Sequence, residues 1–333
     1  MTSLEDVKAT RSYRMWAAFF FLMVFSIMGA LYYATMKIDY EWRWYRVPQY
    51  FAYENTIEVN ASIEGDVASI VTADGTATVL VQGIGETERF KVPEKNLKVS
   101  QGEMISIGDV IGSHTKWAPG LLMLGLGLTI KVSIIATVFG IIIGLFGGIA
   151  RISDNPALKW SAITYIEIIR GSPLLVQIFI WYFVLGTLFN SILQNMGISA
   201  IPPLWYGVAS LATFTGAYVA EIVRAGIQSI HRGQMEAARS LGMTYVNAMR
   251  HVILPQALRR ILPPLAGQFI SLIKDSSLLG IIAIRDLSKA TREIVTTSLQ
   301  PFELWFICAL LYLVLTFSLS MIVQYIERRT LTS

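Results

Sequence analysis

The chain has 333 residues, of which 54% are hydrophobic and 15% are charged, and its formal net charge is +4. Soluble domains carry about 25% charged residues, so this deficit places the chain among membrane proteins. A sequence pI near 9.1 raises the question of a nucleic-acid partner. The chain has no basic groove interleaved with aromatic residues, and its Lys and Arg gather at the ends of apolar runs, so we expect no nucleic-acid partner.

The first apolar run covers residues 15–36 and follows Lys8, Arg11 and Arg14. A helix needs about 20 apolar residues to cross the hydrocarbon core of a membrane. A cleaved signal peptide is the rival interpretation, but its apolar core would be shorter, about 7–15 residues. We therefore predict an uncleaved anchor in 1–36, with its basic N-terminus in the cytoplasm.

Residues 37–116 have a different character, with 8 Lys and Arg against 12 Asp and Glu. Short apolar bursts over 68–71 and 77–81 are separated by turn signals at Asp74-Gly75 and 83–85, which is typical of a small β-rich module. An anchor that enters from the cytoplasm would place this module on the extracytoplasmic side. Residues 99–112 resemble the edge of a lipoyl-like barrel-sandwich module. No lysine stands where a swinging-arm cofactor would attach, so we expect no cofactor there.

Five further apolar runs follow, and the loops between them test the topology. The loop 190–203 contains no Lys or Arg, whereas 231–262 contains five Arg against one acid, Glu236. Because positive loops stay in the cytoplasm, this alternation favours six spans with both termini inside. The loop 285–301 is the exception, since it is predicted outside yet carries three basic residues, partly offset by Asp286 and Glu293. The five runs are about 120–150, 161–189, 204–230, 263–284 and 302–326.

The loop 231–262 has a local structure that the sequence predicts in part. Residues 235–241 read as a two-turn helix that Gly242 ends in the left-handed conformation. Thr244 is placed to cap a second helix, which Pro255 would kink or break. The spacing alone is also compatible with an ordinary amphipathic connector between two spans.

Beyond spacing, the loop resembles the EAA loop of bacterial ABC-importer permeases. The resemblance covers about 117–329 and leaves the first 116 residues outside. Within it, 170–177, 217–227 and 272–278 are similar to the polar amino-acid branch, the histidine/glutamine/glutamate permeases, with Ser172 in place of threonine and Val252 in place of isoleucine. The loop residues that match are Glu236-Ala237-Ala238, Gly242 and Leu254-Pro255.

This resemblance implies an all-α polytopic membrane protein with the type I importer fold and a small β-rich extracytoplasmic insertion. It further implies the permease subunit of an ATP-driven amino-acid importer in the bacterial inner membrane. Its partners would be ABC ATPase subunits, a second permease of the same or a different kind, an extracytoplasmic substrate-binding protein and membrane lipid. The five-span core would be 117–329. The residues implied in ATPase coupling are Gln234, Glu236, Ala237, Ala238, Gly242, Leu254 and Pro255.

The sequence shows no nucleophile paired with a general base, so we expect no enzyme activity in the chain itself. There is no P-loop, so ATP and Mg would belong to the partner ATPase. His114, His231 and His251 lack metal-ligand spacing, so we expect neither a metal nor a cofactor.

Several charged residues fall within the predicted spans, where they usually face the interior of a bundle or a cavity. Two i, i+3 pairs, Glu167 with Arg170 and Glu221 with Arg224, would lie at similar depth toward the cytoplasm. They fit either a salt-bridge network that braces the bundle or a gate that binds an amino acid, and Lys274 with Asp275 fits either a pathway or a packing pair. The candidates for the pathway or gate are Arg170, Gln177, Thr215, Tyr218, Glu221, Lys274, Asp275 and Ser276.

Two other function classes remain open at this point. One is a membrane-anchored sensor whose 37–116 module recognises a ligand, and the other is an ion-coupled secondary transporter. The charges do not identify the amino acid. Two structural expectations are independent of function: Gly140, Gly144, Gly147 and Gly148 would let a neighbouring helix pack closely, and Cys308 would be a packing residue.

Overall fold

The computed structural model describes residues 11–331, with side chains described from 13 to 325. Lys8 and the side chain of Arg11, on which the predicted orientation of the first span depends, lie outside this range. The described chain divides into two compact units, one ending at Tyr45 and one beginning at Arg46. Within the described residues six helices are long and apolar enough to cross a membrane, the number predicted. They are Tyr13–Lys37, Leu121–Arg151, Leu174–Asn195, Pro203–Gln228, Tyr245–Ile282 and Pro301–Tyr325.

The first unit consists mainly of α2 (Arg11–Lys37). Its large apolar side chains are exposed on all sides, as expected of a helix surrounded by lipid. After the helix, the indole Nε1 of Trp42 donates a hydrogen bond of 3.2 Å to Thr35 Oγ1, and the ring of Trp42 stacks on Trp44. Aromatic residues of this kind are enriched where a span leaves the membrane.

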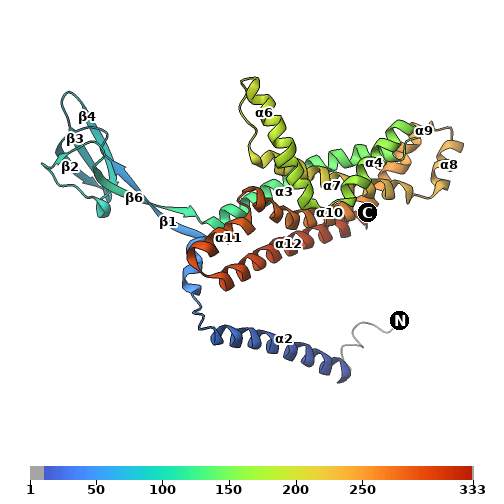
Figure 1. The fold of residues 1–333 in the computed structure, drawn as a ribbon, viewed down its shortest axis with the longest axis horizontal. Coiled ribbons are helices and arrows are strands. Elements are labelled where there is room, and N and C mark those ends of the chain that lie inside the picture. Colours follow the sequence, from blue (N-terminus) through green and yellow to red (C-terminus); the bar gives the residue numbers. More distant parts are fainter. Residues whose placement is uncertain (1–10, 332–333) are drawn as a thin grey trace. The chain divides into compact units, whose positions relative to one another are not determined.

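The second unit begins with a β-rich module of six strands in two sheets (Figure 1). A short 3-10 helix, η1 (Trp44–Tyr50), leads into the module, and a second, η2 (Glu94–Asn96), follows the fourth strand. The larger sheet has the order β4-β3-β2-β5, and the smaller pairs β1 with β6. The strands are β1 (Ala52–Asn60), β2 (Gly65–Ala73), β3 (Thr76–Gln82), β4 (Thr87–Pro93), β5 (Met104–Ile105) and β6 (Val110–Pro119).

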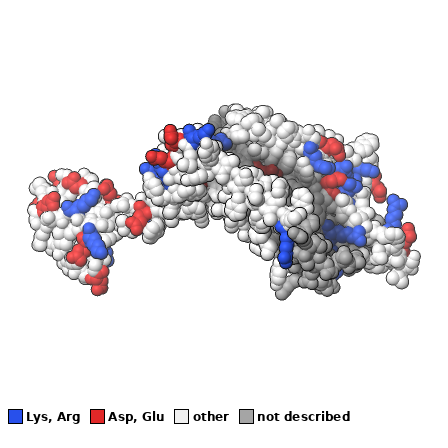
Figure 2. All heavy atoms as spheres, turned by 90° about the horizontal axis from the view of Figure 1, so that it is seen from below, with Lys and Arg blue, Asp and Glu red and all other residues white. Residues whose placement is uncertain are grey.

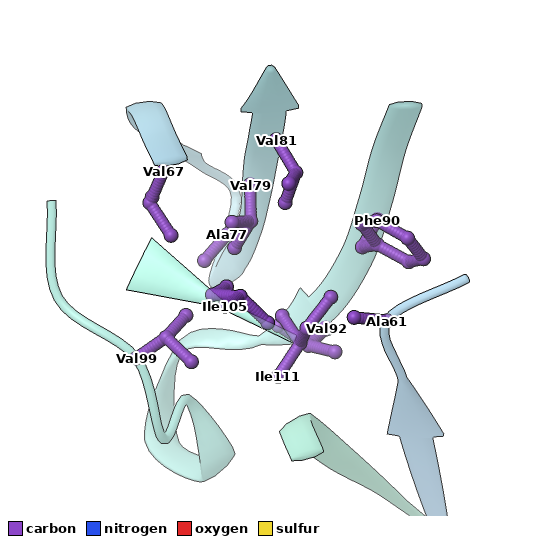
Figure 3. Close-up of a cluster of buried hydrophobic side chains, with 10 residues drawn as sticks. All are labelled: Ala61, Val67, Ala77, Val79, Val81, Phe90, Val92, Val99, Ile105 and Ile111. Atoms are coloured by element: carbon purple, nitrogen blue, oxygen red, sulfur yellow. The ribbon is translucent and has the colours of Figure 1, made fainter. Parts of the chain in front are cut away.

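Alternation along the strands builds the core of this module. In β3 the side chains of Ala77, Val79 and Val81 are fully buried while their neighbours are more exposed, as a strand with one covered face requires. They pack with buried residues of the other strands and loops around one cluster (Figure 3). Asp74 and Gly75 both have positive φ, 50° and 72°, which is the backbone of a tight hairpin turn. The predicted β character and this turn are therefore confirmed.

The paired strands β1 and β6 form a ribbon that carries the module on the helical part of the unit. Antiparallel pairing runs from Ala52 opposite Pro119 to Asn60 opposite Val110, a length of about 30 Å at 3.4 Å per residue. At the base of the ribbon, the amide of Gly120 donates to Phe51 O at 2.8 Å. A Cβ at Gly120 would lie 2.8 Å from Phe51 N, so only glycine fits there.

Two long helices, α3 (Leu121–Arg151) and α7 (Pro203–Gln228), form the centre of the helical part. A Cβ added to Gly140 would lie 2.8 Å from Thr215 Cγ2, and one added to Gly148 would lie 2.8 Å from Val223 Cβ. The glycines of α3 therefore allow α7 to pack against its backbone, as predicted from their spacing.

The predicted span 161–189 is wrong in its boundaries, because the chain bends in the middle of that run. The amphipathic helix α4 (Pro156–Gly171) ends at Ser172, which is extended at φ −114° and ψ 145°. Pro173 disfavours helical backbone at the residue before it, which explains the break. The membrane-length helix begins beyond it and consists of α5 (Leu174–Phe179), a π-helical segment η3 (Ile180–Gly186) and α6 (Thr187–Asn195).

The predicted span 263–284 is part of a much longer helical stretch. It begins with α9 (Tyr245–Ala248), passes through a π-helical segment η4 (Met249–Ile253) and continues as α10 (Leu254–Asp275). Pro255 therefore does not break the helix. The widened turns of η4 lie immediately before it, where a proline otherwise clashes with the carbonyl four residues earlier.

The C-terminal helices surround a buried carboxylate. A 3-10 segment η5 (Ser276–Ile282) leads to α11 (Leu287–Ser298), which precedes α12 (Pro301–Leu331). Asp286 caps α11 by accepting hydrogen bonds from the amides of Ser288 at 3.0 Å and Lys289 at 3.1 Å. Burial raises the pKa of Asp286, although these bonds and one from Tyr312 act in the opposite direction. Cys308 is buried nearby, as predicted for a packing residue.

Candidate functional site

The loop that resembles the EAA loop forms a short helix with a well-defined end. This helix, α8, runs from Arg232 to Ser240, so it starts three residues before the predicted Met235. At its end the amide of Gly242 donates to Arg239 O at 3.0 Å and that of Met243 to Ala238 O at 3.2 Å. Gly242 has φ +85°. This is the Schellman motif, and it confirms the left-handed position predicted for Gly242.

One face of α8 is open and the other is held by the protein. Glu236 and Ala237 are exposed whereas Ala238 is buried. After the helix, Leu241 is 84% exposed, and Tyr245 and Val246 are exposed too. A small side chain at 237 beside exposed apolar residues offers a surface that another protein can approach closely.

The covered face of α8 is connected to two membrane helices. Met235 packs against a buried cluster that includes Val223 of α7 and Ile261 of α10. The amide Nε2 of Gln256 donates to Gln234 Oε1 at 3.2 Å. A displacement of α8 would therefore be passed to α7 and α10 rather than absorbed by a loose loop. Of the other predicted coupling residues, Leu254 is half-buried and Pro255 is exposed.

A second cluster joins the ends of α3, α4 and α7 through charged side chains. The guanidinium of Arg151 lies 3.0 Å from Glu221 Oε2 and 3.3 Å from Glu167 Oε1. Glu221 also accepts from Arg224 Nε at 3.0 Å. Both carboxylates of this charge cluster are thus bound by arginines, which is the bracing network predicted as one of the two interpretations.

Arg170 lies close to this charge cluster, and its guanidinium group is not neutralised by an ion pair within the described residues. Its guanidinium lies over the ring of Tyr218, 5.3 Å from the centroid. Among the described residues it has no carboxylate within ion-pair distance, and the side chain is exposed. The predicted pairing of Arg170 with Glu167 is wrong, because Glu167 is held by Arg151 instead. Together Arg151, Arg170 and Arg224 carry three positive charges, whereas Glu167 and Glu221 carry two negative charges. The group therefore has a net charge of +1.

Three other predicted pathway residues are buried in the packing. Gln177 is 4% exposed and its Nε2 donates to Ile169 O at 2.7 Å and to Ser172 Oγ at 2.9 Å. It therefore closes the turn between α4 and α5. Ser276 donates to Ile273 O in its own helix. Thr215 is fully buried against Gly140, and its hydroxyl has no partner among the described side chains.

Lys274 and Asp275 lie at the end of α10, where the helix narrows into η5. Lys274 is exposed and Asp275 is half-buried. No ion pair within the described residues involves either of them. Both charges therefore remain open to a partner or a passing solute.

Arg151 is the functional-site residue that sequence reasoning missed. From the sequence it is only a basic residue at the end of an apolar run, although in the structure it joins three helices. The signal available in the sequence is that Glu167 and Glu221 are predicted at the same depth as Arg151, toward the cytoplasm. Within residues 11–331 no group of His, Cys, Asp and Glu is placed to hold a metal ion.

The comparisons with known proteins match the helical part of the chain. Residues 136–332 match the family described as "Binding-protein-dependent transport system inner membrane component". A "probable glutamine ABC transporter permease protein" of Bacillus subtilis is 42% identical over 60% of this chain and 89% of its own length. The glutamine transport system permease protein of Escherichia coli is 38% identical over 63% and 92%.

Solved structures of ABC transporters are also similar to this chain. The crystal structure of an amino acid ABC transporter with histidines has a chain that is 41% identical, with a TM-score of 0.56, over 63% of this chain and 94% of that one. The inward-facing methionine ABC transporter, at 20% identity and a TM-score of 0.53, shares the fold. The match to the family begins after the β module.

Proposed function

The chain belongs to the family of binding-protein-dependent transport system inner membrane components, and on that premise we propose that it is the permease subunit of an ATP-driven importer of a polar amino acid. It is a multi-pass inner membrane protein and a transport subunit rather than an enzyme. Neither a sensor nor an ion-coupled transporter is favoured. ATP and Mg bind to separate ATPase subunits, and a second permease subunit completes the pathway.

The observation that carries this proposal is the construction of α8. Its exposed face presents Glu236 and Ala237, and its covered face is fixed to α7 and α10 through Met235 and Gln256. Closure of the ATPase subunits pushes α8, and the attached spans tilt to change which side of the membrane is open. The chain thus receives mechanical work without binding nucleotide itself.

The order of the spans supports an orientation. Three candidate spans, 121–151, 174–195 and 203–228, separate the β module from α8. An odd number of crossings places the module and α8 on opposite sides of the membrane. If α8 contacts a cytoplasmic ATPase, the module is extracytoplasmic, and both termini are cytoplasmic. The basic loop after 282 would then lie outside, where Glu293 offsets it by pairing with Arg285 at 2.7 Å.

The amino acid would meet the charged residues that the fold leaves open. Arg170 with the ring of Tyr218 is suited to a carboxylate, and Asp275 with Lys274 is suited to the ends of a zwitterion. Glu221 is held by two arginines and is better suited to a gate, because a movement of α7 against α3 would break its ion pair with Arg151 while the pair with Arg224 on its own helix is kept. Two of the relatives named above are described as glutamine permease proteins, which makes a neutral polar amino acid the first substrate to test.

The test is to isolate the intact complex and to crosslink from position 236. A photo-reactive residue at Glu236 should crosslink to an ATPase chain, and an ATPase should copurify with the protein. The matched position is Arg292, exposed on α11, which lies on the other side of the membrane in the proposed orientation. Repeated isolation of a transport-active protein without an ATPase, or crosslinks from 236 that never reach one, would contradict the proposal.

A second measurement addresses the pathway. Arg170→Gln should abolish uptake of radiolabelled amino acid while ATP hydrolysis by the complex persists, because coupling at α8 is left intact. Lys159→Gln, which removes an exposed charge from the same helix, should have little effect. Equal loss in both variants would contradict a role for Arg170 in the pathway.

A further inference from the structure

Three large apolar side chains of the β module are exposed on segments that the backbone brings to one end of the larger sheet. Ile84, Met104 and Ile107 are 107%, 74% and 70% exposed, and we call them the module tip. The module has a complete core of its own, so exposed apolar side chains on neighbouring segments are candidates for an interaction site.

Backbone contacts bring the three loops together. Gly65 pairs with Ile105, and Asp66 pairs with Met104. The Cβ of a residue at 65 would lie 2.7 Å from Gly83 N, so the loop that carries Ile84 lies directly against this pair. The amide of Gly108 donates to Ala61 O at 2.8 Å, which fixes the turn that carries Ile107. The tip is therefore built by pairing rather than by a loose loop.

Acidic residues surround the tip and basic residues are absent from it. The segments 61–88 and 99–115, which supply all the tip loops, contain no Lys or Arg. The basic residues of the module are placed elsewhere, on β4, on η2 and beside it, and near the ribbon base. The space-filling view shows acidic side chains along the outer margin of the module (Figure 2). The exposed acids in the tip loops, which we call the acidic rim, are Glu64, Asp66, Glu86, Glu103 and Asp109.

We propose that the module tip and its acidic rim dock a basic surface on the importer's substrate-binding protein. The inference rests on the proposed function, which places the module opposite the ATPase side of the membrane, where a binding-protein-dependent importer receives its binding protein. Apolar contacts at the tip hold the complex, and the rim steers a cationic partner into register. A second copy of the module is a poor occupant, because two acidic rims repel each other.

The geometry of the ribbon fits this role. A paired ribbon of about 30 Å joins the sheet to Gly120 at the start of α3, so the tip can contact the outer surface of a protein seated on the permease. Most β1 side chains are exposed, so the ribbon is a stalk rather than part of the core.

The first experiment places a photo-reactive amino acid at Ile84 or Met104 in the full-length transporter, assembled with its ATPase. The probe is the purified binding protein of the same organism that stimulates the ATP hydrolysis of the complex. Val71 is the matched control, since it is 61% exposed on the same sheet but beside the hairpin turn at Asp74 and Gly75. Crosslinks to the binding protein should form from 84 and 104 and be at least several-fold weaker from 71.

The second experiment reverses charges. Glu64→Lys with Glu86→Lys should raise the half-saturating concentration of binding protein about ten-fold at low salt, and the difference should shrink at high salt. Glu54→Lys with Glu94→Lys makes the same charge change away from the tip and should alter it less than about two-fold. All four side chains are exposed, so folding is preserved.

The outcomes separate the two proposals. Crosslinks from 84 and 104 that reach only another copy of the chain or lipid, or equal effects of the two double substitutions, would overturn docking at the tip. An ATPase that still copurifies and responds to changes at Glu236 would leave the importer proposal intact. Loss of the ATPase itself would contradict the importer proposal instead.

Discussion

The guanidinium of Arg151, at the end of α3, lies 3.0 Å from the carboxylate of Glu221 on α7. The two side chains are 19% and 24% exposed, so the pair is mostly shielded from water. Loss of a shielded ion pair that joins two helices is destabilising, and Arg151→Gln should lower the free energy of unfolding by about 1–3 kcal/mol. Thermal unfolding of the purified complex measures this, with Lys159→Gln as the exposed control. A double-mutant cycle with Glu221→Gln should give a coupling of about 0.5–3 kcal/mol; additive losses would contradict the pairing.

The glycine face of α3 gives a prediction about packing. A Cβ at Gly148 would lie 2.7 Å from Ala220 O and 2.8 Å from Val223, whereas one at Gly127 would meet nothing within 4 Å. Gly148→Leu should therefore destabilise the protein by about 1–3 kcal/mol or more through overpacking, and Gly127→Leu should be tolerated. Size-exclusion profiles and thermal unfolding of the two variants provide the comparison. Equal behaviour would mean that α7 does not pack on this face.

Gly242 allows a test of coupling that does not change charge. With φ +85° it occupies the left-handed region, where a Cβ costs about 1–2 kcal/mol. Gly242→Ala should loosen the end of α8 and lower both uptake and substrate-stimulated ATP hydrolysis, while the membrane helices stay folded. Gly267→Ala, in open space on α10, is the matched control and should be neutral. Uptake by Gly242→Ala at the wild-type rate would show that the end of α8 transmits nothing.

Asp286 gives a prediction about pH, because burial raises its pKa. Its contribution to stability is fully present below the pKa of the unfolded chain and is lost as pH rises through the higher folded value. Asp286→Asn is uncharged at every pH, although its single oxygen can accept only one of the two amide hydrogen bonds. The stability of the variant relative to the wild type should therefore rise as the pH is raised from about 4 toward neutral, which thermal unfolding at several pH values would reveal. A difference that does not change with pH would contradict the raised pKa.

Asp286→Ala separates charge from capping at the same position. Alanine accepts neither amide of α11, and loss of such a cap costs about 1 kcal/mol. The alanine variant should be less stable than Asp286→Asn at every pH. If the two variants unfold together, the hydrogen bonds from Ser288 and Lys289 contribute nothing to stability.

Hydropathy predicted the number of spans and their approximate positions, because length and apolar content are local properties. It missed the bend at Gly171-Ser172-Pro173, since apolar residues continue on both sides and the pre-proline backbone marks the break. The sequence also predicted that Pro255 would kink or break the second helix, and the helix continues through Pro255 after a π-helical segment. A π-helical turn depends on the backbone conformation of several residues together, so no single residue type predicts where it will form.

The helix ends around the α8 loop could be predicted from the sequence because a capping residue acts on residues close to it in the chain. Gly242 and Thr244 each act within four residues of their own position. The pairing of Arg151 with Glu221 joins residues 70 positions apart, and which of several arginines a glutamate selects is decided by how α3, α4 and α7 pack. For the same reason the sequence predicted strands in the module but not that the first and last would pair.

That last pairing has a consequence for how the molecule is made. β1 emerges from the ribosome early, but its partner β6 is the final strand of the module and runs directly into α3. Strand β1 therefore lacks its pairing partner until all of the strands between β1 and β6 have been synthesised. The ribbon can therefore be complete only when the chain has been made up to the residues that directly precede the hydrophobic helix α3.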